Sequence, residues 1–275
     1  MYGNTTVDHR MLPKAEYFNP GPDISWLVRQ FESIIYSNPN VVTDKFVPRE
    51  DVSVVFQFGD LPCLISPVNQ LLPHYFIAPV TPSANSIRIS GNLNCFIATC
   101  NPTILSRVLD ISLKPEGTIH VSLPDALLEP VWKEMKTEHT AAGRITIFTR
   151  FINRLHPARY VPDETDRIYD MILQKGINTQ LHDIISECAV SERTLQRRFR
   201  TRLGATPKML VRILRINYIW SIIHEGADID YHDLVFLGHY FDQNHLIKDF
   251  KSITGETPER FFRRNLGVAR ILSGK

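Results

Sequence analysis

The chain has 275 residues, 43% of them hydrophobic, so it is long enough to bury a sizeable core and to form two domains. No apolar stretch approaches the roughly 18 residues that a membrane-spanning helix needs, and the N-terminus lacks a basic segment followed by an apolar run. We therefore expect a cytoplasmic protein with no membrane association, and its formal net charge of +2 is nearly balanced.

The cysteines give no sign of a metal centre. They contain no CxxC pair, and a reducing cytosol would keep them as free thiols. We expect no structural zinc, no other metal and no cofactor. The four residues are Cys63, Cys95, Cys100 and Cys188.

Short β-rich runs dominate the chain up to about Lys114, separated by Pro, Asn, Ser and Gly. These runs are SVVFQF from Ser53, CLISPV from Cys63, HYFIAPV from His74, SIRIS from Ser86 and NCFIATC from Asn94. Helical patterns are expected at 24–36 and 103–109, then from Pro124 and from Gly143. The aromatic residues among the strands could line a ligand site, although aromatic residues on alternating strands more often form a core; they are Trp26, Phe56, Phe58, Tyr75 and Phe76.

A polar segment with two prolines, HPARYVPDETD from His156, has the composition of a linker. Beyond it nearly every segment has a helical pattern. We therefore predict an α+β protein with a β-rich sensing or dimerisation domain at 1–158 and an all-α domain at 159–275.

Capping residues divide the second half into helices. The expected N-caps are Asn178, Ser191, Thr206, Asp230, Asp242 and Thr257, with Pro207 and Pro258 each at a first helical position. The expected ends are Cys188, Gly204, the neighbourhood of Gly226, Gly255 and Arg263.

One stretch of the chain occurs twice. LQRRFRTRLGATP from Leu195 returns as LIKDFKSITGETP from Leu246. Each copy lies in a helix, turn, helix arrangement, which is the helix-turn-helix motif. The helix between the copies, from Pro207 to about residue 225, would span about 28 Å, compared with about 34 Å between successive major-groove faces. We infer two units that enter adjacent major-groove segments on one side of a duplex.

The helix that Ser191 caps has two distinct faces. Leu195 and Phe199 lie one turn apart and would point into the core, whereas Arg193, Gln196, Arg197 and Arg200 make a separate polar stripe. A charge run on a helix is usually only a solvated face. On the second helix of this motif, however, Arg can bind guanine and Gln adenine with paired hydrogen bonds. The stripe therefore favours contact with DNA.

Four segments together resemble a known family. SERTLQRRF from Ser191, LRINYIWSII from Leu214, DQNHLIKDF from Asp242 and GETPERFFR from Gly255 make 178–264 similar to the DNA-binding domain of AraC/XylS transcription regulators. The resemblance implies two helix-turn-helix units joined by a linker helix, and a cupin-like N-terminal domain that binds an effector or dimerises. The DNA-binding residues indicated by the stripe and the resemblance are Arg193, Thr194, Gln196, Arg197 and Arg200 in the first unit, and Gln243, Asn244, His245, Lys248 and Lys251 in the second.

The chain departs from the family pattern at both turns. The family usually has a small residue in the first helix of each unit and a glycine at the turn. In this chain those positions hold Ile185 and Ala189 in the first unit, and Val235 and His239 in the second. A left-handed backbone is costly for Ala and His, so we expect atypical turns, with Gly238 as an alternative position for the bend.

Other classes of protein fit less well. The sequence has no G-x-S-x-G, P-loop or HExxH motif, so we expect no enzyme. The alternative is an effector-binding or partner-binding protein with degenerate DNA-binding units, which the intact arginine stripe disfavours. The partners expected are double-stranded DNA and RNA polymerase; a small-molecule effector and a homodimer are left open by the resemblance.

Overall fold

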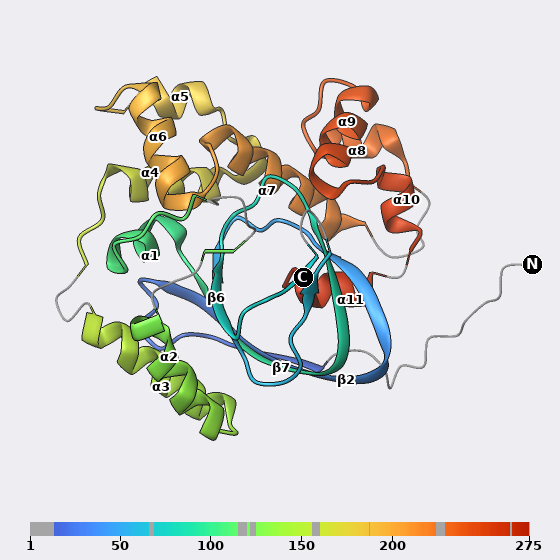
Figure 1. The fold of residues 1–275 in the computed structure, drawn as a ribbon. Coiled ribbons are helices and arrows are strands. Elements are labelled where there is room, and N and C mark those ends of the chain that lie inside the picture. Colours follow the sequence, from blue (N-terminus) through green and yellow to red (C-terminus); the bar gives the residue numbers. More distant parts are fainter. Residues whose placement is uncertain are drawn as a thin grey trace, which may run out of the picture.

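The computed structural model describes residues 14–65, 69–114, 120–121, 125–155, 160–186, 188–223, 229–264 and 266–274. A β-rich part comes first in the chain and a helical part follows it (Figure 1). This order confirms the predicted α+β class. The predicted boundary between 158 and 159 lies outside the described residues, and the division into two domains stays a prediction.

The β-rich part is a seven-stranded antiparallel sheet in the order β1-β2-β7-β3-β6, with β4 paired to β5 and β7. The strands are β1 Lys14–Phe18, β2 Val28–Phe46, β3 Val52–Gln57, β4 Cys63–Leu64, β5 Gln70–Leu71, β6 Tyr75–Ala78 and β7 Asn85–Cys100. The pairing of β2 with β7 shifts register between Val28 and Gln30 and again between Asn38 and Val42. Such irregularities bend strands, and the sheet curls around an interior (Figure 1).

The predicted helix at 24–36 is wrong. A turn occupies the beginning of this segment, and β2 starts at Val28. The apolar residues fit a helical period, but β1 and β7 pair with the segment on both sides, and its Ile-Ile-Tyr run suits a strand. The runs from Ser86 and Asn94 merge into the single strand β7.

Three predicted helices of the first half are present. They are α1 Pro102–Val108, α2 Asp125–Thr137 and α3 Ala141–Leu155. Asn101 caps α1, since its side chain accepts hydrogen bonds from the amides of Thr103 and Ile104. Helix α3 packs on the sheet through Phe148, whose ring meets Phe31 edge-on at 5.9 Å between centroids.

The helical half follows the predicted caps closely. Its helices are α4 Glu164–Lys175, a 3-10 turn Gly176–Asn178, α5 Leu181–Ser186, α6 Glu192–Leu203, α7 Pro207–Ile222, α8 Tyr231–Leu237, α9 Gln243–Thr254, α10 Pro258–Phe262 and α11 Gly267–Leu272. The predicted N-caps that hold are Ser191, Thr206, Asp230, Asp242 and Thr257. The predicted N-cap at Asn178 is wrong, because Asn178 lies in the 3-10 turn and α5 starts only at Leu181. The linker helix ends at Ile222, and Gly226 lies outside the described residues.

Buried side chains of the sheet and of the helices form one continuous cluster, from Phe31 and Phe96 to Phe199, Trp220 and Phe250. The aromatic residues considered as ligand-site candidates belong to different clusters. Phe56 is fully buried in this core, whereas Phe76, 6% exposed, is buried in a second, smaller cluster. No helix in the described part of the chain is long and apolar enough to cross a membrane.

Candidate nucleic-acid interface

The first helix-turn-helix unit consists of α5 and α6. Helix α6 begins at the N-cap Ser191, whose hydroxyl accepts a hydrogen bond from the amide of Thr194 at 3.4 Å. It ends at Gly204, which has φ of 89°. Only glycine adopts this left-handed backbone without strain, so the length of α6 is set by its own sequence.

The predicted stripe lies on the outside of α6. Arg193, Arg197 and Arg200 are exposed, while Thr194 and Gln196 are half-buried. None of the three arginines forms an ion pair with a carboxylate of the described residues. Gln196 donates a hydrogen bond to Glu192 at 2.9 Å, one turn earlier on the helix. The three guanidinium groups are therefore available for a ligand.

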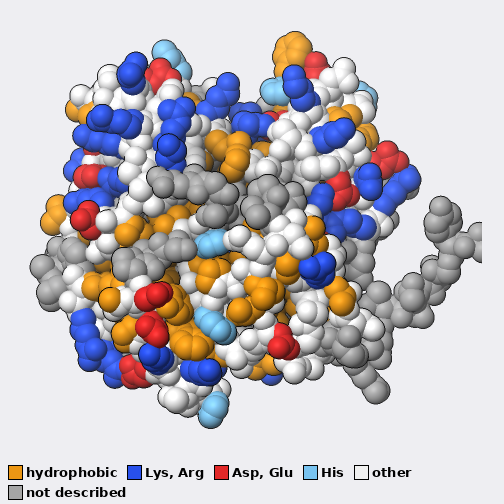
Figure 2. Space-filling view, viewed as in Figure 1, with side chains coloured by type: hydrophobic (Ala, Val, Ile, Leu, Met, Phe, Trp, Pro, Cys, Tyr) orange, Lys and Arg blue, Asp and Glu red, His pale blue; other side chains and the backbone are white. Residues whose placement is uncertain are grey.

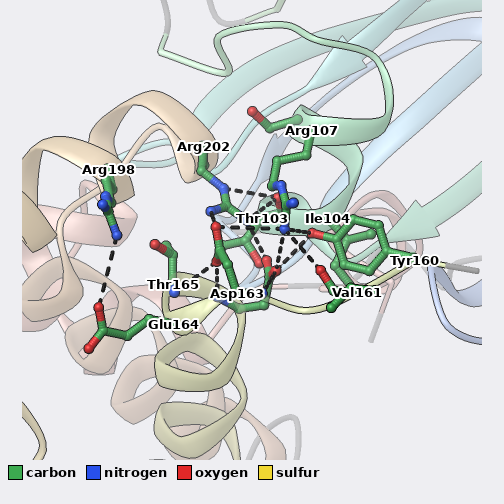
Figure 3. A network of polar contacts seen from close by, with 12 residues as sticks. Thr103, Ile104, Arg107, Tyr160, Val161, Asp163, Glu164, Thr165, Arg198 and Arg202 are labelled. Carbon is green, nitrogen blue, oxygen red and sulfur yellow. Dashed lines mark hydrogen bonds and ion pairs between the residues drawn. The ribbon is translucent and has the colours of Figure 1, made fainter. Parts of the chain in front are cut away.

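Arg202 has a different environment from the rest of the arginine run. It points inward, and its guanidinium donates to the carbonyl of Thr103 at 2.8 Å and 3.1 Å, and to Asp163 at 2.6 Å (Figure 3). It also pairs with Asp166, which is fully buried. Arg107 of α1 reaches Asp166 at 3.2 Å. Helix α6, here called the first recognition helix because its stripe is predicted to contact DNA, is thus fixed to α1 and to the start of α4.

The same network sets the ionisation of Asp163. Burial alone would raise the pKa of this carboxyl, but the hydrogen bonds from Arg202 and from the Asp166 backbone outweigh burial and lower the pKa. Asp163 is also the N-cap of α4, because its carboxylate accepts a hydrogen bond from the amide of Asp166 at 3.1 Å. Sequence reasoning assigned Asp163 to a linker and missed this role. The pattern Asp163, then Asp166 three residues later, was the available capping signal.

The second unit consists of α8 and α9. Its turn uses His239 in the left-handed conformation, with φ of 54°, whereas Gly238 is right-handed with φ of −84°. The proposed alternative bend at Gly238 is therefore wrong. A Cβ atom at 238 would come within 2.8 Å of the Leu234 carbonyl, so glycine is needed there for space. Ala189 is absent from the positive-φ residues, which among the described non-glycines are only Asp110 and His239.

Helix α9 repeats the division seen in α6. Leu246, Phe250 and Ile253 are buried. All five predicted site residues on this helix are exposed: Gln243, Asn244, His245, Lys248 and Lys251. The structure therefore places the two predicted sets on α6 and on α9, which is called the second recognition helix.

A polar contact fixes α9 to the linker helix. Arg212 of α7 pairs with Asp249 of α9 at 2.5 Å, and the hydroxyl of Tyr240 donates to the other oxygen of Asp249 at 2.9 Å. Burial, followed by the charge of Asp249, raises the pKa of Tyr240, so its hydroxyl stays a donor at neutral pH. The second recognition helix is thus oriented by groups outside the predicted site.

A groove lies between α7 and α9, and basic residues line it. Those from α7 are Lys208, Arg212 and Arg215, and Lys248 faces them from α9. Figure 2 shows Lys and Arg side chains over this upper face, between the two helical units and on them. These three α7 residues are not among the predicted site residues. With 16 residues, α7 spans about 24 Å, less than predicted.

The β-rich part contacts the C-terminal end of both recognition helices. The amide of Leu113 donates to the carbonyl of Thr201 in α6 at 2.7 Å. In the second unit, the amide of Ala84 donates to Ile253 at 2.6 Å, and Lys45 donates to the Thr254 carbonyl at 2.8 Å. These contacts satisfy carbonyls that a helix end leaves without partners. Both units are thus bound to the β-rich part.

The curled sheet contains a separate apolar cavity of about 90 Å³. Apolar side chains of β2, β3, β6 and β7 line it, together with Leu272 of α11. Its charged groups are Glu32 and Arg49, which pair at 2.9 Å. No group of three or more His, Cys, Asp or Glu that could hold a metal occurs among the described residues.

Comparisons with known proteins agree with this geometry in the helical half. Residues 185–264 match a family model described as a helix-turn-helix domain, from within α5 to just beyond α10. No curated protein matches the chain in sequence. Among solved structures, ToxT from Vibrio cholerae is 14% identical over 84% of this chain and 97% of its own, with a TM-score of 0.46. A ToxT structure with a bound unsaturated fatty acid is 15% identical over 87% and 97%, also with a TM-score of 0.46.

Proposed function

We propose, from the AraC-type helix-turn-helix domain at residues 185–264, that this protein is a sequence-specific DNA-binding transcription regulator whose two units contact adjacent major-groove segments. The observation that carries the proposal is the repeated placement of exposed polar residues on α6 and α9. Arg193 and Arg197 can donate paired hydrogen bonds to guanine, and Asn244 can pair with adenine. Lys251 and Lys208 suit phosphate contacts.

The groove between α7 and α9 extends this surface. Arg212 is already paired with Asp249, but Lys208, Arg215 and Lys248 would neutralise phosphates between the two units and release counterions, so affinity should fall steeply with salt. Both α6 and α9 are bound to the β-rich part, and α9 is also paired with α7 through Arg212 and Asp249. A preorganised pair of helices loses less entropy on binding than a flexible pair would.

The test uses the full chain and a library of random duplexes. Selection should enrich sites with two half-sites about one helical turn apart. Arg197→Ala should relax the preference within one half-site. The matched control is Lys133→Ala on α2, which removes an exposed cation paired with Glu129 at 2.8 Å, away from α6 and α9. A folded chain that enriches no sequence would support the alternative, a binding protein with degenerate DNA-binding units.

We further propose that the sheet cavity is an effector site. Its apolar lining and the Glu32–Arg49 pair suit a small, mostly apolar molecule with one polar group. A thermal-shift panel of such molecules tests the proposal, with Val55→Phe, which fills the cavity, as control. A shift that survives in Val55→Phe would place the ligand elsewhere. Binding to RNA polymerase and homodimer formation stay predictions of the family resemblance.

A further inference from the structure

The second unit carries an unusually exposed apolar surface. The side chain of Phe241 is 91% exposed, the highest value among the large hydrophobic residues that the structure describes, and Phe236 of α8 follows at 81%. Leu237 is 38% exposed. Figure 2 shows hydrophobic side chains at the top of the α8–α9 unit, beside Lys and Arg. Clustered exposed apolar side chains are typical of binding surfaces, and these three lie within six residues of the chain.

Phe241 and Phe236 differ in their position relative to α9. It directly precedes Asp242, the N-cap of α9, whose carboxylate accepts the amide of His245 at 2.7 Å. The next residues along the chain, Gln243 and Asn244, are exposed. Phe241 therefore stands at the end of α9 from which the proposed base contacts begin, whereas Phe236 lies on the preceding helix.

We infer that Phe241 is a specificity-determining residue that contacts the C5 methyl group of thymine in the major-groove segment bound by α9. This inference rests on the proposed function. Lys248 and Lys251 are exposed further along α9, so the partner that this helix binds is a polyanion, and Phe241 at the start of the helix calls for a polyanion that also offers an apolar group. In the major groove of DNA, that group is the thymine methyl.

The contact also accounts for a difference between the two units. The stripe of α6 has Arg193, Gln196 and Arg197, whereas the equivalent positions of α9 hold Asn244, Ile247 and Lys248. The second helix therefore has fewer groups that can form paired hydrogen bonds with a base. An apolar contact from Phe241 gives it a second means of discrimination.

The experiment replaces thymine by deoxyuridine, which removes only the methyl group. Starting from the site that the full chain selects, each thymine is replaced in turn, and Kd is measured by fluorescence anisotropy. The wild-type chain should bind about fourfold more weakly at one or two positions in the half-site of α9, the value for one buried methyl group. Phe241→Ala should bind the thymine and deoxyuridine duplexes equally. Phe236→Ala, the matched control, should keep the wild-type dependence.

Five outcomes overturn the inference. The wild-type chain could be indifferent to every replacement, or its selected half-site could lack thymine. Phe241→Ala could keep the methyl dependence, which would assign the contact to another residue. Phe236→Ala could lose it as well, which would indicate a general effect of the apolar surface. A chain that selects no site at all refutes the proposed function and this inference with it, so the two failures are distinguishable.

Discussion

Replacing Arg202 by alanine tests how the first recognition helix is held. The guanidinium is bound to the Thr103 carbonyl, to Asp163 at 2.6 Å and to the buried Asp166. Removing one member of a buried ion pair costs about 3 to 5 kcal/mol, because the other charge is left unpaired. Asp166 keeps two partners in the variant. Arg107 lies 3.2 Å from its carboxylate, and the Tyr160 hydroxyl donates to the same carboxylate at 2.7 Å. We therefore expect the low end, about 3 kcal/mol of unfolding free energy.

The loss should depend on pH in a defined direction. The folded-state pKa of Asp163 lies below its ordinary value of 3.8, with Arg202 as its partner. A carboxyl with a lowered pKa adds stability that is fully present above 3.8 and disappears as the pH falls through the folded-state pKa. The difference between wild type and Arg202→Ala should therefore be constant near neutral pH and shrink below pH 3.8.

Urea unfolding with linear extrapolation measures both effects. The control is Arg198→Ala on the same helix, because Arg198 is 41% exposed and only approaches Glu164 at 3.9 Å. An exposed pair of this kind is worth about 0 to 1 kcal/mol. If Arg202→Ala costs no more than Arg198→Ala, or if its cost grows as the pH falls below 3.8, the network does not hold α6 in the way described.

Four further predictions concern the two units. Arg197→Ala should cost about 1 to 3 kcal/mol of binding free energy and relax preference at one or two base pairs, whereas Lys251→Ala should weaken all sequences alike and lower the salt slope by roughly one. Site selection at several salt concentrations checks both, and unchanged specificity in Arg197→Ala would contradict the assignment. His239→Gly should raise the free energy of unfolding by about 1 kcal/mol, because φ of 54° strains a side chain; a lower melting temperature would argue against this. Tyr240→Phe should cost about 1 to 2 kcal/mol, because Asp249 loses a buried hydrogen bond, and urea unfolding that shows no loss would refute it.

The helical half was predictable because its signals are local. The cap at Ser191 and the cap at Asp242 each depend on a side chain within three residues of the amide that it binds. The glycine at 204 and the glycine at 255 end α6 and α9 for an equally local reason, since both have positive φ. The 3.6-residue period then assigned Arg197 to an outer face without knowledge of the partner helices.

The tertiary structure alone decided the rest. Residues 24–36 have a pattern that suits a helix, and only pairing with β1 and β7 makes most of them a strand. Arg202 belongs to the same arginine run as Arg197, yet it is buried because the fold brings Thr103 and Asp166, which are 99 and 36 residues away, against it. Caps and turns depend on neighbours along the chain, whereas strand pairing and the burial of charge depend on which distant segments the folded protein places in contact.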